Sequence, residues 1–198
     1  MATYSDIRYN MTLSSSTTGG GSLVLLATET ASSDATISFT SNIDSTYKEY
    51  VFRFYDIHPA TNDVSLTFQA DTGTNTSYNQ TMTTTFFQAR HNEADTTAAV
   101  AYTTGRDIAQ GTGFQRLHYE VGNGNDESCT GTLHIFDPSN TTFVKHFYAR
   151  ANNYGESDES ADCFVAGYFN TTTALTRFQF KMTSGNIDAG VIKMYGVN

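Results

Sequence analysis

The sequence predicts an all-β protein, namely an antiparallel β-sandwich of jelly-roll type with a partly extended N-terminal arm. The composition is one reason, because 14 Phe and 12 Tyr among 198 residues supply aromatic side chains that pack well on pleated strands. The pattern is another, because about a dozen short strand-like segments are separated by turn residues. In addition, no window of about ten residues combines helical periodicity with helix caps. These features together predict two packed antiparallel sheets in one domain.

Residues 1–22 are predicted to form the arm, and residues 23–198 the single sandwich domain. The run from Ser14 to Ser22 is a Gly/Ser/Thr linker that buries too little apolar surface to fold alone. The residues before it include five side chains that are candidates for contact with a partner: Tyr4, Ile7, Tyr9, Met11 and Leu13. We expect the arm to order on a neighbouring subunit and to attach the protein to its assembly.

The first half of the domain contains six expected strands. They are Leu23–Thr28, Ala35–Thr40, Glu49–Ile57, Asp63–Ala70, Tyr78–Ala89 and Ala98–Tyr102. The strand at 49–57 is the densest in aromatic and β-branched residues, and we expect His58 and Pro59 to end it because proline has no amide donor. The strand at 63–70 alternates apolar and polar side chains, which is typical of a pleated strand with two different faces.

The second half contains six more. They are Phe114–Val121, Cys129–Phe136, Phe143–Arg150, Asp162–Asn170, Leu175–Met182 and Gly190–Gly196. Phe178, Phe180 and Met182 alternate on one face of the strand at 175–182. Five sequences carry turn chemistry: Asn123–Asp126, Asp137–Asn140, Asn152–Gly155, Ser184–Asn186 and Asp188–Gly190.

The charge balance excludes several classes of partner. Twenty acidic residues outnumber 11 basic ones, so the formal net charge is −9 and no Lys/Arg cluster exists. Nucleic acid and anionic lipid both require a basic surface, so neither is an expected partner. No apolar run reaches the length of a membrane span, and the first residues lack the pattern of a secretory signal. We expect Cys129 and Cys163 to be buried, reduced thiols in a protein made in a cytoplasm.

The chemistry-bearing residues form no recognised catalytic, cofactor or metal motif. The five histidines lack the spacing of a zinc site, so we interpret them as structural or surface residues: His58, His91, His118, His134 and His146. The segment Arg90–Asp95 can place a histidine beside a carboxylate, but a solvated loop is the favoured interpretation. Acidic segments at 123–127 and 156–162 offer oxygen ligands for Ca²⁺, although solvated loops are favoured there too. We therefore predict no catalytic residues, no cofactor and no enzyme, and an enzyme acting on polysaccharide is the least favoured alternative.

Four segments of the chain carry a resemblance to a known class of proteins. They are Tyr50–Pro59, Phe143–Tyr148, Phe164–Asn170 and Arg177–Val197, of which the last, two alternating strands around a glycine-containing turn, is the most specific. In these segments the chain resembles virion structural proteins of tailed phages, in particular those of marine and cyanobacterial phages. The resemblance covers roughly residues 48 to 198 and leaves the N-terminal segment out. It implies a jelly-roll-like particle component, present in many copies and trimeric, with no catalytic residues.

The expected function is therefore that of a capsid decoration (cement) protein, assembled in the bacterial host cytoplasm and located in the virion. Its expected partners are other virion proteins, of the capsid or the tail, and two further copies of itself in a homotrimer. An excess of tyrosines over the needs of one core supports an oligomer: Tyr47, Tyr50, Tyr55, Tyr78, Tyr102, Tyr154 and Tyr168. The alternative is a tail- or fibre-associated module that contacts host surface glycans through exposed Tyr and Asn loops.

Overall fold

The computed structural model describes residues 22–155 and 157–198, and in this part of the chain it contains strands and no helix. No helix that could cross a membrane occurs among these residues. The strands are β1 (Leu23–Thr30), β2 (Ile37–Phe39), β3 (Glu49–Pro59), β4 (Leu66–Thr72), β5 (Met82–Asn92), β6 (Ala98–Tyr102), β7 (Gln115–Arg116), β8 (Cys129–Phe136), β9 (Lys145–Gly155), β10 (Glu159–Phe169), β11 (Leu175–Met182) and β12 (Ile187–Val197).

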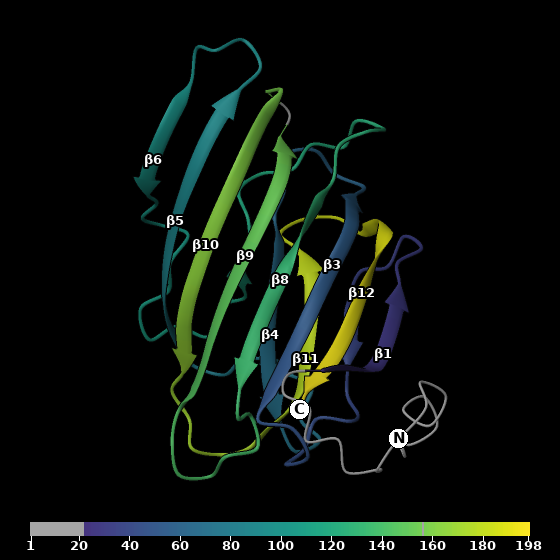
Figure 1. The fold of residues 1–198 in the computed structure, drawn as a ribbon, viewed down its shortest axis with the longest axis vertical. Helices are drawn as coiled ribbons and strands as arrows, with labels where there is room; N and C mark the ends of the chain where they lie inside the picture. Colours follow the sequence, from purple (N-terminus) through teal and green to yellow (C-terminus); the bar gives the residue numbers. More distant parts are fainter. Residues whose placement is uncertain (1–21, 156) are drawn as a thin grey trace, which may run out of the picture.

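These strands form two antiparallel sheets in two layers, which confirms the predicted β-sandwich. The larger sheet has eight strands in the order β1-β12-β3-β8-β9-β10-β5-β6, and the smaller has four in the order β2-β11-β4-β7. In Figure 1 the larger sheet faces the viewer, and β4 and β11 lie behind β8 and β3. One face of the large sheet therefore packs on the small sheet, and the other faces outward.

The core between the sheets is rich in phenylalanine, as the composition predicts. Phe180 of β11 is fully buried, and its ring lies 5.2 Å from that of Phe52 and 5.5 Å from that of Phe54, both on β3. Phe68 of β4 packs edge-on against Phe147 of β9, with ring centroids 5.0 Å apart. Such tilted and edge-on contacts are the favourable arrangements of aromatic rings, so the two sheets are held together by directional packing as well as by apolar burial.

Every expected strand has a counterpart, and three have the predicted bounds: Ala98–Tyr102, Cys129–Phe136 and Leu175–Met182. Two expected turns are wrong. The sequence at 152–155 continues β9, because all four residues are paired with β10 and the first two also with β8. The sequence at 188–190 lies within β12, where the register with β3 shifts on both sides of Ala189. Gly190 there has φ +117°, a backbone conformation that residues with a side chain rarely adopt. The glycine that suggested a turn therefore allows a bulge in the strand.

The region between β6 and β8 departs most from the expected strands. The strand predicted at 114–121 is reduced to the two residues of β7, and the residues after it continue beside the same chain segment as β4, where Leu117 donates to Leu66 and Val121 pairs with Val64. Both faces of β4 are buried. Gln69, on its polar face, donates from Nε2 to the carbonyls of Gln80, Thr112 and Gly113 at 3.0–3.1 Å. The polar face of β4 is thus bonded to the loops that carry Gln80, Thr112 and Gly113.

Candidate binding face on the eight-stranded sheet

The outer face of the large sheet is where exposed rings gather in the described part of the chain. Strand β9 alternates buried and exposed residues, because its inner side chains meet the core while the outer ones meet solvent. Phe87 on β5 and Tyr148 on β9 are 42% and 46% exposed, and Tyr102 on β6 is 52% exposed. Rings this exposed contribute little to the core, so they are available for a partner.

A row of rings crosses β6, β5 and β10 at one level of this face. The register places Tyr102 opposite Phe87, and Phe87 opposite Phe164. The Phe87 and Phe164 rings stack with centroids 4.8 Å apart and planes 3° from parallel. The guanidinium of Arg150 on β9 lies 5.0 Å from the Phe164 ring and is fixed by a bidentate ion pair with Asp162. The row is therefore a flat apolar strip that ends in an oriented cation.

A shallow trough runs beside this row, because the side chains next to the row, Thr85 and Ala166, are small. One pocket of about 320 Å³ and another of about 390 Å³ share Thr85, Tyr148 and Ala166 in their linings, so they are two parts of one depression. The Tyr148 ring is stacked on His134 of β8 at 4.6 Å, and Nδ1 of His134 lies 2.5 Å from a carboxylate oxygen of Glu49. These contacts fix one wall of the trough before any partner binds.

An exposed phenylalanine stands on a rigid loop at the end of the trough. Phe143 is 69% exposed and lines a third pocket of about 510 Å³, together with Phe136 and His146. Its loop is fixed by Asn140, whose side-chain oxygen accepts from the amides of Thr142 and Phe143 at 2.7 and 2.8 Å. Below it, the buried Lys145 ammonium donates to the carbonyls of Phe143 and Thr171, and burial lowers its pKa. Phe143 has the rigid, exposed geometry of an interface anchor.

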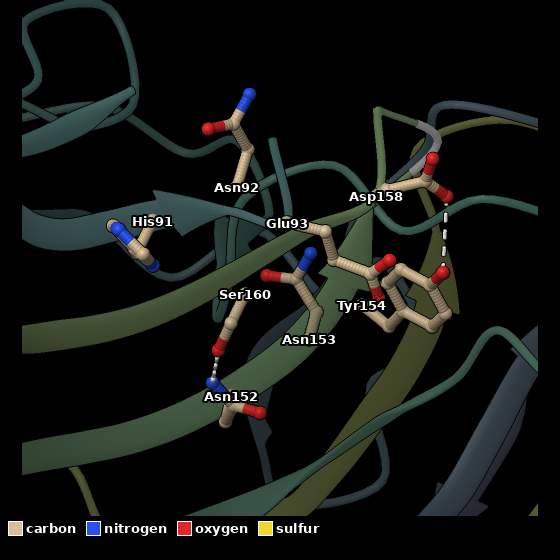
Figure 2. Close-up of a pocket in the computed structure, with 8 residues that line it drawn as sticks. All are labelled: His91, Asn92, Glu93, Asn152, Asn153, Tyr154, Asp158 and Ser160. Atoms are coloured by element: carbon tan, nitrogen blue, oxygen red, sulfur yellow. Dashed lines mark hydrogen bonds between the residues drawn. The ribbon is translucent and has the colours of Figure 1, made fainter. Parts of the chain in front are cut away.

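A polar pocket of about 370 Å³ lies at the opposite end of β9 and β10 (Figure 2). Its lining is His91, Asn92, Glu93, Asn152, Asn153, Tyr154, Asp158 and Ser160. The Tyr154 hydroxyl donates to Asp158 at 3.0 Å, and this bond raises the tyrosine pKa to about 12. Asn153 is almost fully buried, and its side-chain oxygen has no hydrogen-bond partner in the described residues. Amides, a phenol and carboxylates are groups that bind hydroxyl-rich ligands.

The charged segment at 90–95 is divided between two faces. His91 lines the polar pocket, and its Nε2 lies 3.0 Å from Asp95, but both side chains are largely exposed. Arg90 points to the opposite face, where it pairs with Glu159 at 3.2 Å and lies over the Tyr119 ring at 4.7 Å. The histidine–carboxylate pair that this segment can form is therefore present, but it is largely exposed, as in the favoured interpretation of a solvated loop, and lacks the buried setting that strengthens such a pair.

Two residues of the acidic segments and two further histidines are bonded within the fold. Glu127 accepts from the amide of Gly124 within its own loop, and Asp162 binds Arg150. His118 is fully buried and accepts from the amide of Leu66, whereas His58 bonds to the carbonyl of Glu127. Within residues 22–155 and 157–198, no three His, Cys, Asp or Glu side chains are grouped closely enough to hold a metal.

The remaining sequence predictions concern the cysteines, the tyrosines and the arm. Cys129 and Cys163 are free and buried. Tyr50 and Tyr78 belong to the core, so the tyrosine excess is smaller than expected. Phe87, Phe143 and Phe164 add rings outside the core that are not among the predicted tyrosines. The five candidate arm residues Tyr4, Ile7, Tyr9, Met11 and Leu13 lie outside the described residues.

No family model, curated protein or solved structure matches this chain.

Proposed function

We propose that this chain is a non-enzymatic structural protein of a virus particle, built on an elaborated jelly roll. A jelly roll has eight strands in two sheets, formed by folding a long antiparallel ribbon on itself. When β5, β6, β9 and β10 are set aside, the other eight strands pair as the strands of a jelly roll do. The first strand then pairs with the last (β1 with β12), the second with the seventh (β2 with β11), the third with the sixth (β3 with β8), and the two middle strands β4 and β7 with each other.

The observation that carries the proposal is the position of the binding face on the remaining four strands. The hairpins β5–β6 and β9–β10 extend only the larger sheet, and Figure 1 places them together at its left side. The stacked rings of Phe87 and Phe164, the trough beside them and Tyr148 all belong to these strands. Function commonly resides in additions to a common fold, so the added strands and their open apolar face favour a docking role.

The proposed role is that of a decoration protein that binds other virion proteins through this face. The trough supplies an apolar depression and Phe143 an exposed anchor, which are the features of an interface core. The net charge of −9 keeps free copies soluble before assembly. The homotrimer and attachment through the arm are parts of the same proposal, and the bacterial host cytoplasm is the proposed place of assembly.

Copy number in purified particles tests this role directly. Quantitative mass spectrometry against the major capsid protein is expected to give hundreds of copies per particle. A dozen or fewer would place the protein on the tail and overturn the decoration role. Absence from the particle would overturn the structural role altogether.

Two alanine variants test whether the outer face makes the attachment. Phe143→Ala and Phe164→Ala are each expected to reduce incorporation into particles at least tenfold, with little change in melting temperature because both side chains lie outside the core. Leu25→Ala is the matched control, since Leu25 is 53% exposed on β1, at the far edge of the same sheet. Wild-type incorporation of both phenylalanine variants would exclude this face as the attachment surface.

A second candidate function is a tail- or fibre-associated module that contacts host surface glycans. The polar pocket of Figure 2 favours it, because the exposed amide of Asn152 and the Tyr154–Asp158 pair can bind sugar hydroxyls. Saturation-transfer NMR with host polysaccharide separates the two functions. Transfer that disappears in Tyr154→Phe would support the glycan module, whereas no transfer from the wild type would exclude it.

A further inference from the structure

Strand β6 is an edge of the large sheet that lacks the usual protection against pairing. All five residues from Ala98 to Tyr102 are exposed, none is charged, and none is proline. The other three sheet edges are protected, since β1 carries a bulge between Leu25 and Ala27, β2 has three residues, and β7 has two. Natural proteins protect their sheet edges because open backbone groups pair with other strands. The bare edge at β6 therefore indicates a partner strand.

The backbone of β6 has a defined set of open hydrogen-bonding groups. The amide of Asn92 donates to Thr97 at 3.1 Å, and the amide of Thr103 donates to Phe86 at 3.0 Å. Because such pairs alternate along an antiparallel ladder, Ala99 and Ala101 also direct their groups toward β5. Ala98, Val100 and Tyr102 must then direct their amides and carbonyls away from β5. No hydrogen bond within the described residues uses these six groups.

This set is complementary to itself. A second β6 strand in antiparallel orientation uses all six groups only when Val100 faces Val100, with Ala98 opposite Tyr102 at both ends. Shifting the strand by one pair in either direction leaves groups unpaired. Opposed residues in this register place their side chains on the same face, so each Tyr102 ring has the small Ala98 of the second copy as its neighbour.

We propose that β6 pairs with β6 of a second copy around a two-fold axis at Val100. The two large sheets then form one continuous sheet, and their ring rows lie on the same outer face. Tyr102 is already held in place, since its hydroxyl donates to Asp107 at 2.6 Å. The contact does not depend on the proposed function. If the chain forms a trimer, each subunit has one β6 edge, so pairing of β6 with β6 can join two neighbouring trimers.

Single cysteine variants of the full chain test the register at a concentration of about 100 µM. In this pairing the two Val100 Cα atoms lie about 5.5 Å apart, within the range that a disulfide spans. Val100→Cys is therefore expected to convert most chains to a disulfide-linked dimer under mild oxidation. Ala101→Cys is the matched control, because Ala101 faces Ala99 and lies about 8 Å from its own counterpart. The native cysteines are buried and do not interfere.

Amide exchange provides an independent readout. When the wild-type concentration rises from about 5 to about 500 µM, exchange at Ala98, Val100 and Tyr102 is expected to slow at least tenfold. Val100→Pro removes an amide that points away from β5, so the fold is kept while this slowing is lost; Val100→Thr keeps the amide and the slowing. Equal cross-linking of both cysteine variants, no cross-linking of Val100→Cys, or exchange independent of concentration would each overturn the proposal.

The N-terminal arm of another copy is the competing occupant of this edge. Deleting residues 2–21 decides between the two. Under the proposal, Val100→Cys cross-links equally well with and without these residues. Loss of concentration-dependent protection on deletion would assign the edge to the arm and overturn the pairing of β6 with itself.

Discussion

The fully buried His118 provides a sharp test of the fold through its response to acid. Its Nε2 accepts a hydrogen bond from the Leu66 amide at 2.8 Å, and its Nδ1 lies 2.6 Å from the carbonyl of Tyr119. This arrangement requires the neutral ring, because a protonated Nε2 could not accept from an amide. Burial is the main reason that the pKa of His118 is lowered from 6.5 to about 4. Protonation is thus far easier in the unfolded chain than in the folded one.

The free energy of unfolding should therefore fall with pH in a defined window. Between pH 6.5 and pH 4 the unfolded state binds the proton and the folded state does not, so the histidine favours folding fully only above this window. The difference in pKa corresponds to about 3 kcal/mol in total, of which about 2 kcal/mol is lost between pH 7 and pH 5. Urea unfolding at these two pH values measures this loss.

A glutamine variant isolates the contribution of His118 from that of the carboxylates. His118→Gln keeps an acceptor for the Leu66 amide but does not titrate. At pH 7 the variant should be less stable than the wild type, and its own free energy of unfolding should be nearly the same at pH 5 as at pH 7. Asp44 and Asp137, whose pKa values are lowered by hydrogen bonds, lose their contributions mainly at lower pH in both proteins. Equal losses for wild type and variant between pH 7 and pH 5 would refute the buried, neutral histidine.

Three further predictions concern the core, the thiols and the arm. Phe180→Ala should lower the free energy of unfolding by about 3–5 kcal/mol, as measured in urea, because the ring is fully buried between both sheets; a loss below about 1 kcal/mol would contradict this packing. Mass spectrometry without reductant should find two free thiols. Cys129 and Cys163 lie on strands separated by β9, about 10 Å apart and beyond the reach of a disulfide, and burial raises the pKa of Cys163 to about 12, so a two-dalton deficit at this pair would contradict the strand order. Deleting residues 2–22 should leave the melting transition unchanged and reduce incorporation into particles; incorporation at the wild-type level would make the arm dispensable for attachment.

The strands could be predicted from the sequence because the signals for a strand are local. Phe178, Phe180 and Met182 alternate with polar residues and are followed by turn residues, and this pattern predicts both ends of β11 correctly. Turn chemistry is less reliable, since Gly190 supplies a positive φ to a bulge as readily as to a turn. At 152–155, two neighbouring strands outweighed the turn-forming residues. The errors therefore occur where pairing between distant segments decides the local structure.

The binding face could not be assembled from the sequence, because it depends on which strands become neighbours. Tyr102, Phe87 and Phe164 are separated by many residues, and only the register of β6, β5 and β10 places them in one row. A partial signal was present in Phe86 and Phe87. Adjacent residues of a strand point to opposite faces of the sheet. One of these two rings therefore lies outside the core unless both faces of the sheet are covered. The same reasoning applies to Phe164, which lies between the buried Cys163 and Val165.

The two halves of the outer face differ in how their rings meet solvent, and this difference supports a docking role for one of them. On β3 and β12 two rings are covered by cations: Lys193 lies 5.6 Å from the exposed Tyr55 ring, and Arg53 lies 5.4 Å from the half-buried Tyr195 ring. Long cationic side chains of this kind shield apolar surface while keeping their charge in water. On the added strands, Arg150, which is held by Asp162, lies over the Phe164 ring, but among the described residues no cation lies over the rings of Phe87, Tyr102 or Tyr148. The trough and the β6 edge beside it therefore stay open, as surfaces must be if other chains are to cover them on assembly.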